Sequence, residues 1–404
     1  MSRLRISVFV LLISNLAIIT AAKTTKDVLQ CRDEDNEPVD WFVMYKIPKI
    51  RESSLPDVRE GISYLYITDK TVGTGWKLST KDVTSKNSIP ARTLAPLYND
   101  KLSSKLLWVM YNDQPPDGRA NANYGHAKGV VMTNGESGFW LIHSVPGFPL
   151  IPNSGESRRR RITLNDTTEA EDKVPEGEYG YPDTGRTNGQ SFMCISVNSD
   201  QIDVISQQLM YNQIIVYRKN LPESTANGYP SFVDASNQVR IRDPPYNKKA
   251  VIRSTLGLEF TSFAKSDKWQ RELYDDFVGP QLNSDLLVES WQNGRGKLPS
   301  ECNGSRVLNI ESINLREANV VFTSTHDHSK WAVSMTNGKH GNWVCVGDIN
   351  RAETQFSRGG GTVCLKSPDL WKYYRNVVND MEPCPKKNVG IFGKLKHWFS
   401  SKFG

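Results

Sequence analysis

The sequence lacks the features that define several large classes of protein. Beyond its N-terminus, the 404-residue chain has no apolar run long enough to cross a bilayer. None of the six cysteines forms a Cys-x-x-Cys pair, which argues against zinc ribbons and thioredoxin-type redox sites. Apolar residues (38%) and charged residues (23%) are near the globular average, which excludes a disordered, collagenous or coiled-coil chain. The length fits roughly two or three domains, or one large core.

Positive charge is also scarce on the body of the chain, although the formal net charge is +6. The two ends of the chain carry more positive charges than the net charge. These charges lie in the first five and last twenty residues, on Arg3, Arg5, Lys386, Lys387, Lys394, Lys396 and Lys402. The body is therefore close to neutral. A polyanion would need a local group of side chains to bind there, because bulk charge does not supply the attraction.

Residues 1–22 have the three parts of a secretory signal peptide: a basic start, the apolar stretch Ile6–Ile19 and small residues at the cleavage position. A short membrane anchor is the alternative interpretation. Six cysteines fit an oxidising compartment, and so do two glycosylation sequons, at Asn165 and Asn303. We therefore expect a protein of the secretory pathway.

The distribution of β-branched and aromatic residues predicts a mixed fold, α/β in the broad sense (α+β). The expected strands are Trp41–Tyr45, Ile62–Ile67, Leu106–Tyr111, Gly129–Met132, Phe139–His143, Phe192–Val197, Leu256–Phe263, Leu286–Trp291, Val307–Ile313 and Trp343–Val346. The expected helices are Gln201–Met210, Asp267–Phe277 and a helix from Pro368 to about Met381. The last begins with Ser-Pro-Asp, which supplies an N-cap, a proline at the first position and an acid in the first turn.

Two segments differ from the rest in composition. Residues 152–190 contain four consecutive arginines followed by an acidic stretch with Gly and Pro, which favours a solvated loop insertion over a binding role. Residues 385–404 form a basic tail in which aromatic and aliphatic residues recur at roughly helical spacing. Such a tail suits weak contact with a membrane surface or a polyanion, and a frayed solubilising tail is the alternative.

An internal repeat is the most informative feature of the chain. Residues 126–140 and 328–343 share the order His-x-Lys, apolar strand, Met-Thr-Asn-Gly turn and a second strand that begins near a Trp. This order predicts a duplicated hairpin, and hence two similar halves related by a pseudo-two-fold axis. We place these halves at residues 23–235 and 236–384.

Each half then presents one histidine and one lysine on the same face, because residues two apart in a strand point to the same side. Two such pairs suit metal-free phosphoryl transfer. One neutral histidine attacks phosphorus, the other protonates the leaving oxygen, and the lysines bind the charged oxygens. The alternative is that these histidines and lysines are solvent-exposed strand residues without a catalytic role. A metal site at His326 and His328 lacks a clear set of further ligands.

The His-x-Lys motif and the segment Gly347–Asn350 resemble elements of the phospholipase D superfamily, although Met335 stands where that superfamily usually has an Asp. The chain is more similar to the deoxyribonuclease II family of acid endonucleases. The matching segments run from Cys31 to Cys384 and include residues 38–46, 124–129, 138–146, 327–331, 343–351 and 358–364. Ala332 departs from the cysteine that family members often have at this position.

The resemblance implies a role for specific residues. His126 and His328 match the catalytic histidines, and Lys128 and Lys330 match the phosphate-binding lysines. His143, Asp348 and Asn350 match possible supporting residues. Which histidine is the nucleophile stays open, with a preference for His126. The implied disulfides are Cys31–Cys194, Cys302–Cys384 and Cys345–Cys364.

The family further implies two phospholipase D-like halves, each a mixed sheet flanked by helices, and DNA cleavage at acid pH without cofactor or metal. The expected products carry 3′-phosphate ends, and the expected location is the lysosome or the extracellular space. A phospholipase D-like lipid hydrolase and a non-catalytic DNA- or membrane-binding protein are the alternatives. The oligomeric state stays open.

Overall fold

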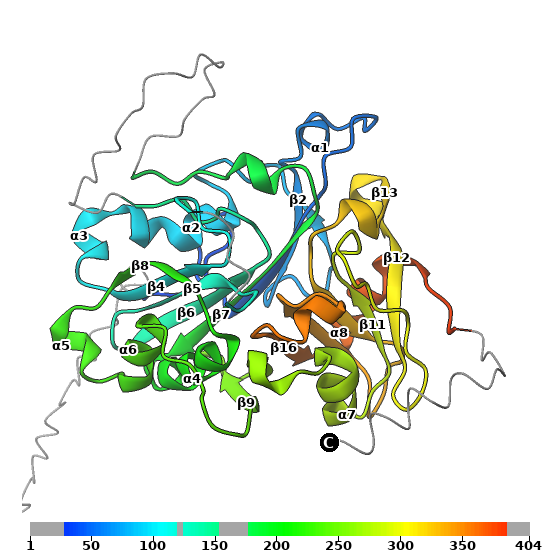
Figure 1. Ribbon diagram of the computed structural model, residues 1–404. Coiled ribbons are helices and arrows are strands. Elements are labelled where there is room, and N and C mark those ends of the chain that lie inside the picture. Colours follow the sequence, from blue (N-terminus) through cyan, green and yellow to red (C-terminus); the bar gives the residue numbers. More distant parts are fainter. Residues whose placement is uncertain (1–27, 119–123, 153–176, 386–404) are drawn as a thin grey trace, which may run out of the picture.

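The computed structural model describes residues 28–118, 124–152 and 177–385 (Figure 1). The expected signal peptide, the four arginines, the Asn165 sequon and the basic tail lie outside these residues. Asn303, at the second sequon, is exposed. Within the described part of the chain, no helix is long and apolar enough to cross a membrane.

The strands form two large sheets, which Figure 1 shows side by side. The first sheet contains β1 (Trp41–Lys46), β2 (Tyr64–Thr68), β3 (Lys77–Leu78), β4 (Leu107–Asn112), β5 (Lys128–Thr133), β6 (Ser137–His143), β7 (Gln190–Asn198) and β8 (Val216–Asn220). The second contains β9 (Asn247–Arg253), β10 (Glu259–Lys265), β11 (Leu286–Glu289), β12 (Val307–Leu315), β13 (Val320–Thr323), β14 (Trp331–Ser334), β15 (Trp343–Gly347), β16 (Gly360–Lys366) and β17 (Val378–Met381).

Five strands of each sheet follow the same order. The first sheet contains the run β4-β5-β6-β7-β1, and the second contains β11-β14-β15-β16-β10. Every neighbouring pair within both runs is antiparallel. The repeated segments form the hairpins β5–β6 and β14–β15, so the predicted duplication of the fold is confirmed. Gly135 and Gly338 follow Asn in the two turns and have positive φ angles of 92° and 95°, which only glycine adopts easily.

Short helices cover the sheets, and two longer ones lie close to the junction between them. The helices are α1 (Pro56–Glu60), α2 (Ile89–Leu94), α3 (Asp100–Ser103), α4 (Ile202–Asn212), α5 (Glu223–Ala226), α6 (Pro230–Ser236), α7 (Gly279–Leu282) and α8 (Pro368–Val377). Helix α4 belongs to the first half of the chain but packs against β9 and β10 of the second sheet. The Gln208 amide on α4 donates a hydrogen bond to the Ser262 carbonyl on β10.

One hydrophobic core joins the two sheets. Along β1, Trp41, Val43 and Tyr45 face this shared core, whereas Phe42 and Met44 face a second cluster on the outer side of the first sheet. This alternation follows from the two-residue period of a strand. The shared core draws side chains from strands of both sheets. The two halves are therefore held together by burial of apolar surface, the main favourable contribution to folding.

The structure corrects three expectations from the sequence. The last helix ends at Val377, and the next four residues form β17 on the edge of β12, because β-branched valines favour an extended backbone. The expected helix Asp267–Phe277 is two short turns, interrupted at Gln270, whose φ is 58°. Residues 177–190 are not a solvated loop, since Tyr179 and Tyr181 are buried in the core of the first half.

Three disulfides are present, and they are the pairs that the family resemblance implied: Cys31–Cys194, Cys302–Cys384 and Cys345–Cys364. Cys345 and Cys364 lie directly opposite each other on β15 and β16. The third bridge therefore braces the strand that leads to Asp348. Three disulfides fit folding in an oxidising compartment.

Candidate active site

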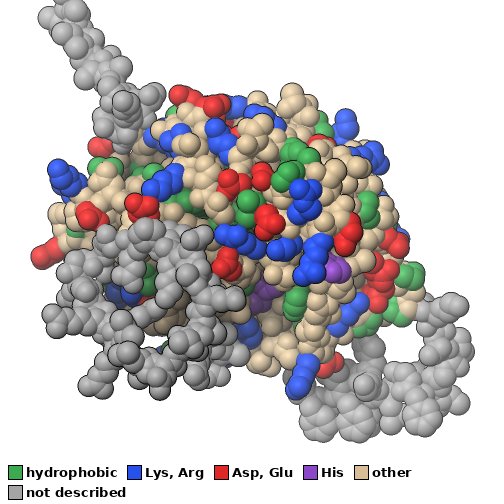
Figure 2. Space-filling view, turned by 90° about the horizontal axis from the view of Figure 1, so that it is seen from above, with side chains coloured by type: hydrophobic (Ala, Val, Ile, Leu, Met, Phe, Trp, Pro, Cys, Tyr) green, Lys and Arg blue, Asp and Glu red, His purple; other side chains and the backbone are tan. Residues whose placement is uncertain are grey.

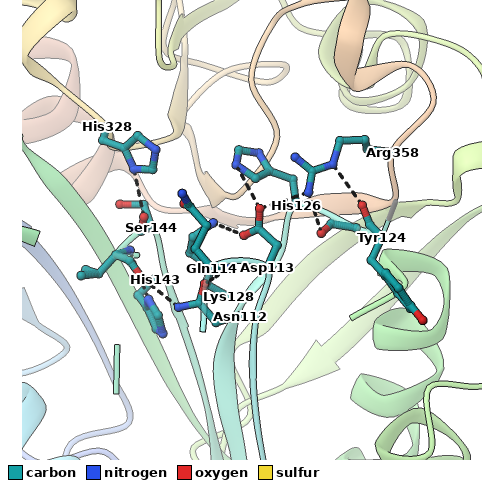
Figure 3. A network of polar contacts seen from close by, with 12 residues as sticks. Asn112, Asp113, Gln114, Tyr124, His126, Lys128, His143, Ser144, His328 and Arg358 are labelled. Atoms are coloured by element: carbon teal, nitrogen blue, oxygen red, sulfur yellow. Dashed lines mark hydrogen bonds and ion pairs between the residues drawn. The ribbon is translucent and has the colours of Figure 1, made fainter. Parts of the chain in front are cut away.

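The two His-x-Lys segments meet at the ends of β5 and β14, where the two sheets adjoin (Figure 3). A glycine of the opposite half fixes each histidine backbone. The His126 N–H donates to the Gly359 carbonyl at 2.8 Å, and the His328 N–H donates to the Gly189 carbonyl at 2.9 Å. The two contacts are equivalent under the pseudo-two-fold, because each glycine directly precedes the residue paired with the last lysine of β1 or β10.

Asp113, which directly follows β4, organises the N-terminal pair. Its carboxylate accepts hydrogen bonds from the Lys128 ammonium and, at 3.0 Å, from the Arg358 guanidinium. The same carboxylate lies 3.8 Å from Nε2 of His126. Burial alone would raise the pKa of Asp113, but the charges of Lys128 and Arg358 outweigh it and lower that pKa. Asp113 is therefore a buried anion beside an imidazole.

Arg358 comes from the C-terminal half and holds the N-terminal histidine segment. Its Nε donates to the Tyr124 carbonyl at 3.0 Å, and its Nη2 donates to the Gly125 carbonyl at 3.1 Å. The buried ammonium of Lys265 binds three backbone carbonyls of the turn that ends at Arg358. Arg358 thus lies on a turn that Lys265 holds in place, and it positions the residues that lead into His126.

His328 has a different environment. Its Nδ1 atom lies 3.0 Å from the Ser144 carbonyl, 3.3 Å from the Gln190 side-chain oxygen and 3.2 Å from the Lys330 Nζ. The two oxygen acceptors favour the tautomer with its proton on Nδ1, which leaves a lone pair on Nε2. The Trp291 ring packs edge-on against this imidazole, with 5.3 Å between ring centroids.

The segment before His328 is anchored on the first sheet. The buried Asp327 carboxylate accepts hydrogen bonds from the Tyr45 hydroxyl on β1 and from the Ser329 backbone N–H and hydroxyl. The Lys330 N–H donates to the Ser191 hydroxyl on β7. These bonds tie the C-terminal pair to the opposite half, as Arg358 does for the N-terminal pair.

The strand registers show where the pseudo-symmetry is broken. Asn112 pairs with Lys128 across β4 and β5, and continuing the β11–β14 pairing beyond Glu289 and Trp331 sets Ser290 opposite Lys330. Asp113 therefore corresponds to Trp291. The anion beside His126 has an aromatic ring as its counterpart beside His328, so the two histidines are not chemically equivalent.

The site disfavours the charged form of both histidines. Burial lowers the pKa of His126 well below its usual value, and the charges of Lys128, Arg358 and Lys330 lower it further. Burial likewise lowers the pKa of His328, with added effects from Lys330, Lys128 and His126. The charges of both lysines lower the pKa of each imidazole, so the two His-x-Lys pairs form one electrostatic site.

Asp348 lies in the same site, opposite Ser144 in the pseudo-symmetric arrangement. One of its carboxylate oxygens accepts the Gly361 N–H at 2.8 Å, as the Ser144 hydroxyl accepts the Ser191 N–H. Burial raises the pKa of Asp348 to about 7, against the opposing charges of Lys128 and Lys330. This carboxyl group therefore changes charge near neutral pH.

His143 lies apart from the pair. Figure 3 shows its ring pointing away from His126 and His328. It packs against the rings of Phe148 and Phe192, and its Nδ1 accepts the Val145 N–H. Burial, followed by the charge of Lys128, lowers its pKa well below the usual value. Its contacts are those of a neutral residue that shapes the turn after β6.

The structure thus brings together His126, Lys128, His328, Lys330 and Asp348. Asn350 is buried two residues beyond Asp348, and its side-chain oxygen has no hydrogen-bond partner among the described residues. Sequence analysis missed the site residues Asp113, Gln190 and Arg358. A cluster of three or more potential metal ligands is absent from the residues that the structure describes, and His326 and His328 form no such group there.

Comparisons with known proteins add independent information. The model of the family described as Deoxyribonuclease II matches residues 30–384. Plancitoxin-1 of Acanthaster planci is 36% identical over 373 residues, which cover 91% of this chain and 96% of that protein. Deoxyribonuclease-2-alpha of Mus musculus is 35% identical and covers 89% of this chain and 94% of its own length. Cell death-related nuclease 6 of Caenorhabditis elegans is 32% identical, with 93% of each chain covered.

Proposed function

Because the chain belongs to the deoxyribonuclease II family, we propose that it is an acid endodeoxyribonuclease that uses two histidines and no divalent metal. One observation carries this proposal: the His-x-Lys pairs of two duplicated halves share a single buried site, fixed by contacts across the halves. Two imidazoles and two ammonium groups supply a nucleophile, a proton donor and charge for the phosphate oxygens.

The local contacts assign different roles to the two histidines. We assign His328 as the nucleophile, because the Ser144 carbonyl beside Nδ1 favours a proton there, and this tautomer leaves the Nε2 lone pair for phosphorus. We assign His126 as the general acid, because Asp113 stabilises a positive charge on the adjacent imidazole. This assignment reverses the preference for His126 as nucleophile that we drew from the sequence.

The reaction then proceeds in two steps. Nε2 of His328 forms a bond to phosphorus while the P–O5′ bond breaks, and His126 gives its proton to O5′. His126 then removes a proton from water, and the resulting hydroxide attacks phosphorus and breaks the P–N bond. The phosphate stays on the 3′ oxygen, so the products carry 3′-phosphate ends. Lys128 and Lys330 bind the non-bridging oxygens throughout.

The biological setting follows from the same family. We propose that residues 1–22 are removed as a signal peptide, that residues 23–235 and 236–384 form the two halves, and that Asn303 carries a glycan. A lysosomal or extracellular location suits catalysis at acid pH. One relative is named a cell death-related nuclease, so DNA of dying or engulfed cells is the substrate that we propose.

Plasmid cleavage at about pH 5 in excess EDTA tests this function directly. We expect the mature protein to cleave and His328→Ala to lose at least about a thousandfold in rate, because the covalent step has no other nucleophile. His340→Ala is the matched control, since His340 is an exposed histidine far along the β14–β15 turn. No cleavage by the folded parent would contradict the proposal and would make lipid hydrolysis and DNA binding the functions to test.

Two groups set the expected pH dependence. A bound phosphodiester raises the low pKa of His126, and falling pH then populates the protonated acid. Asp348 is neutral below its pKa of about 7 and charged above it, where its carboxylate repels the phosphate. Both effects favour acid pH. Asp348→Asn is neutral at every pH, so its activity at pH 7.5 relative to pH 5 should rise roughly three- to tenfold over the parent ratio.

Asp275→Asn is the matched control for this pH profile. Burial raises the pKa of Asp275 to about 6, but its charged neighbours are Asp276, Glu301 and Arg351 rather than the site lysines. The control should keep the parent profile of initial rate against pH. A profile of Asp348→Asn that also superimposes on the parent profile would show that Asp348 has no part in the acid preference.

A further inference from the structure

Two cationic hollows adjoin the segments that lead into the two histidines. The first, which we call the β13 groove, has a volume of about 470 Å³ and is lined by residues 49–52 and 321–323 together with His326. The second, which we call the linker groove, has a volume of about 560 Å³ and is lined by Gln213, residues 237–242, Asp267 and Lys268. Residues 237–242 connect α6 to β9.

Equivalent positions in the two halves line the two grooves. Lys46 and Lys265 are the last residues of β1 and β10, and each binds an arginine carbonyl of its own half. Lys49 and Lys268 each follow three residues later and line the β13 groove and the linker groove, respectively. The two grooves thus share one equivalent lysine, whereas most of their other lining comes from β13 on one side and from the α6–β9 connection on the other.

Each groove adjoins one of the two histidines. His326 lines the β13 groove, and its carbonyl accepts the N–H of Gly189, the glycine that also fixes His328. On the other side, the Arg240 guanidinium of the linker groove stacks on the Tyr124 ring at 3.9 Å. Tyr124 lies two residues before His126, as His326 lies two residues before His328.

Both grooves combine positive charge with apolar surface. The β13 groove offers Lys49, Arg51 and His326, with Glu52 as the acid in its lining and Glu60 lying 3.8 Å from the Lys49 ammonium. The exposed Val321 side chain borders the groove. Figure 2 shows Lys and Arg side chains next to His side chains on the face seen from above.

The linker groove offers Arg240, Arg242 and Lys268 against Asp267, which is already hydrogen-bonded to Gln213. In a body that is otherwise close to neutral, these two local groups fit a polyanion.

We propose that the two grooves hold the DNA backbone on either side of the scissile phosphate, so that the strand crosses the histidine pair from one half to the other. The proposal rests on the proposed nuclease function and adds the path of its substrate. Each groove would contact at least one flanking phosphate. The exposed Arg51 and Arg242 guanidiniums are suited to this contact, because arginine binds phosphate in a bidentate manner.

Binding of DNA to the full-length His328→Ala protein tests the path without cleavage. Fluorescence anisotropy would compare a 20-base-pair duplex with thymidylyl-thymidine, which carries only the central phosphate. Arg51→Ala and Arg242→Ala should each weaken duplex binding roughly three- to tenfold. Each should also lower the slope of log affinity against log salt by about 0.9, the value for one lost phosphate contact. Binding of the dinucleotide should change less than twofold.

Lys339→Ala is the control, because this exposed lysine lies on the β14–β15 turn, at the end of β14 opposite to the histidines. It should bind both ligands as the parent does. Unchanged duplex binding by either groove variant would overturn the two-sided path while the parent still cleaves plasmid, and the proposed function would then stand. A parent that neither cleaves nor binds DNA would overturn both proposals.

Discussion

In a single turnover, His126→Ala should regain most of its lost rate of strand scission on DNA whose scissile P–O5′ linkage is replaced by P–S5′, and His328→Ala should not. A thiolate leaves without protonation, so the sulfur substrate removes the need for a general acid and keeps the need for a nucleophile. On ordinary DNA, loss of the acid should cost about 10²- to 10⁴-fold in rate. On the sulfur substrate, His126→Ala should come within roughly tenfold of the parent.

The measurement is the single-turnover rate of strand scission, with enzyme in excess, on a labelled oligonucleotide with one sulfur linkage, at pH 5, alongside the all-oxygen strand. The parent is the reference on both substrates, and circular dichroism establishes that each variant is folded. Rescue of His328→Ala instead would reverse the two roles. Failure to rescue either variant would mean that neither histidine protonates the leaving oxygen.

Asp113→Asn should lower the free energy of unfolding by about 3 kcal/mol, because it leaves two buried cations without their counter-ion. The Lys128 side chain is 1% exposed and the Arg358 side chain 11% exposed, so solvent does not replace the lost carboxylate. The pKa of Asp113 is lowered, and its contribution is lost only as pH falls through that lowered value. The destabilisation should therefore be present at pH 5 as well as at pH 7.

Asp183→Asn is the matched control for this prediction. Its ion pair with Arg186 is on the surface, with side chains 72% and 38% exposed, and should contribute less than about 1 kcal/mol. Denaturant titrations of parent and variants at both pH values give the comparison. Equal stabilities of Asp113→Asn and Asp183→Asn would contradict the view that Asp113 is the structural centre of the N-terminal pair.

Local patterns predicted much of the fold. Runs of β-branched and aromatic residues located β1, β4, β6 and β7, and the Ser-Pro-Asp cap located the start of α8, whose Ser367 hydroxyl accepts the Leu370 N–H. Prediction from local composition failed for strands that depend on pairing with a neighbouring strand. Strand β16 begins with glycines, which carry no β signal, and β17 is a short strand that pairs with residues 310–313 of β12.

The residues of the candidate site also fall into those that the sequence predicted and those that only the structure identified. The repeat identified both histidines and both lysines, because duplicated sequence places equivalent side chains at equivalent strand ends. Asp113 had no local signal, since its role depends on Lys128, fifteen residues away, and on Arg358 of the other half. Residues 177–190 were assigned to a solvated loop, although Gly189 and Gln190 contact His328.

The sequence by itself determined the duplication, the chemistry of the two His-x-Lys pairs, the cysteine set and the family resemblance, because each depends on residue types at short spacing. Only the tertiary structure decided that the pairs share one site and that their surroundings differ, with Asp113 on one side and Trp291 on the other. Contacts across the halves place the Ser144 carbonyl beside Nδ1 of His328 and bring Arg358 to Asp113 beside His126. Such contacts join residues far apart in the chain, and no local pattern records them.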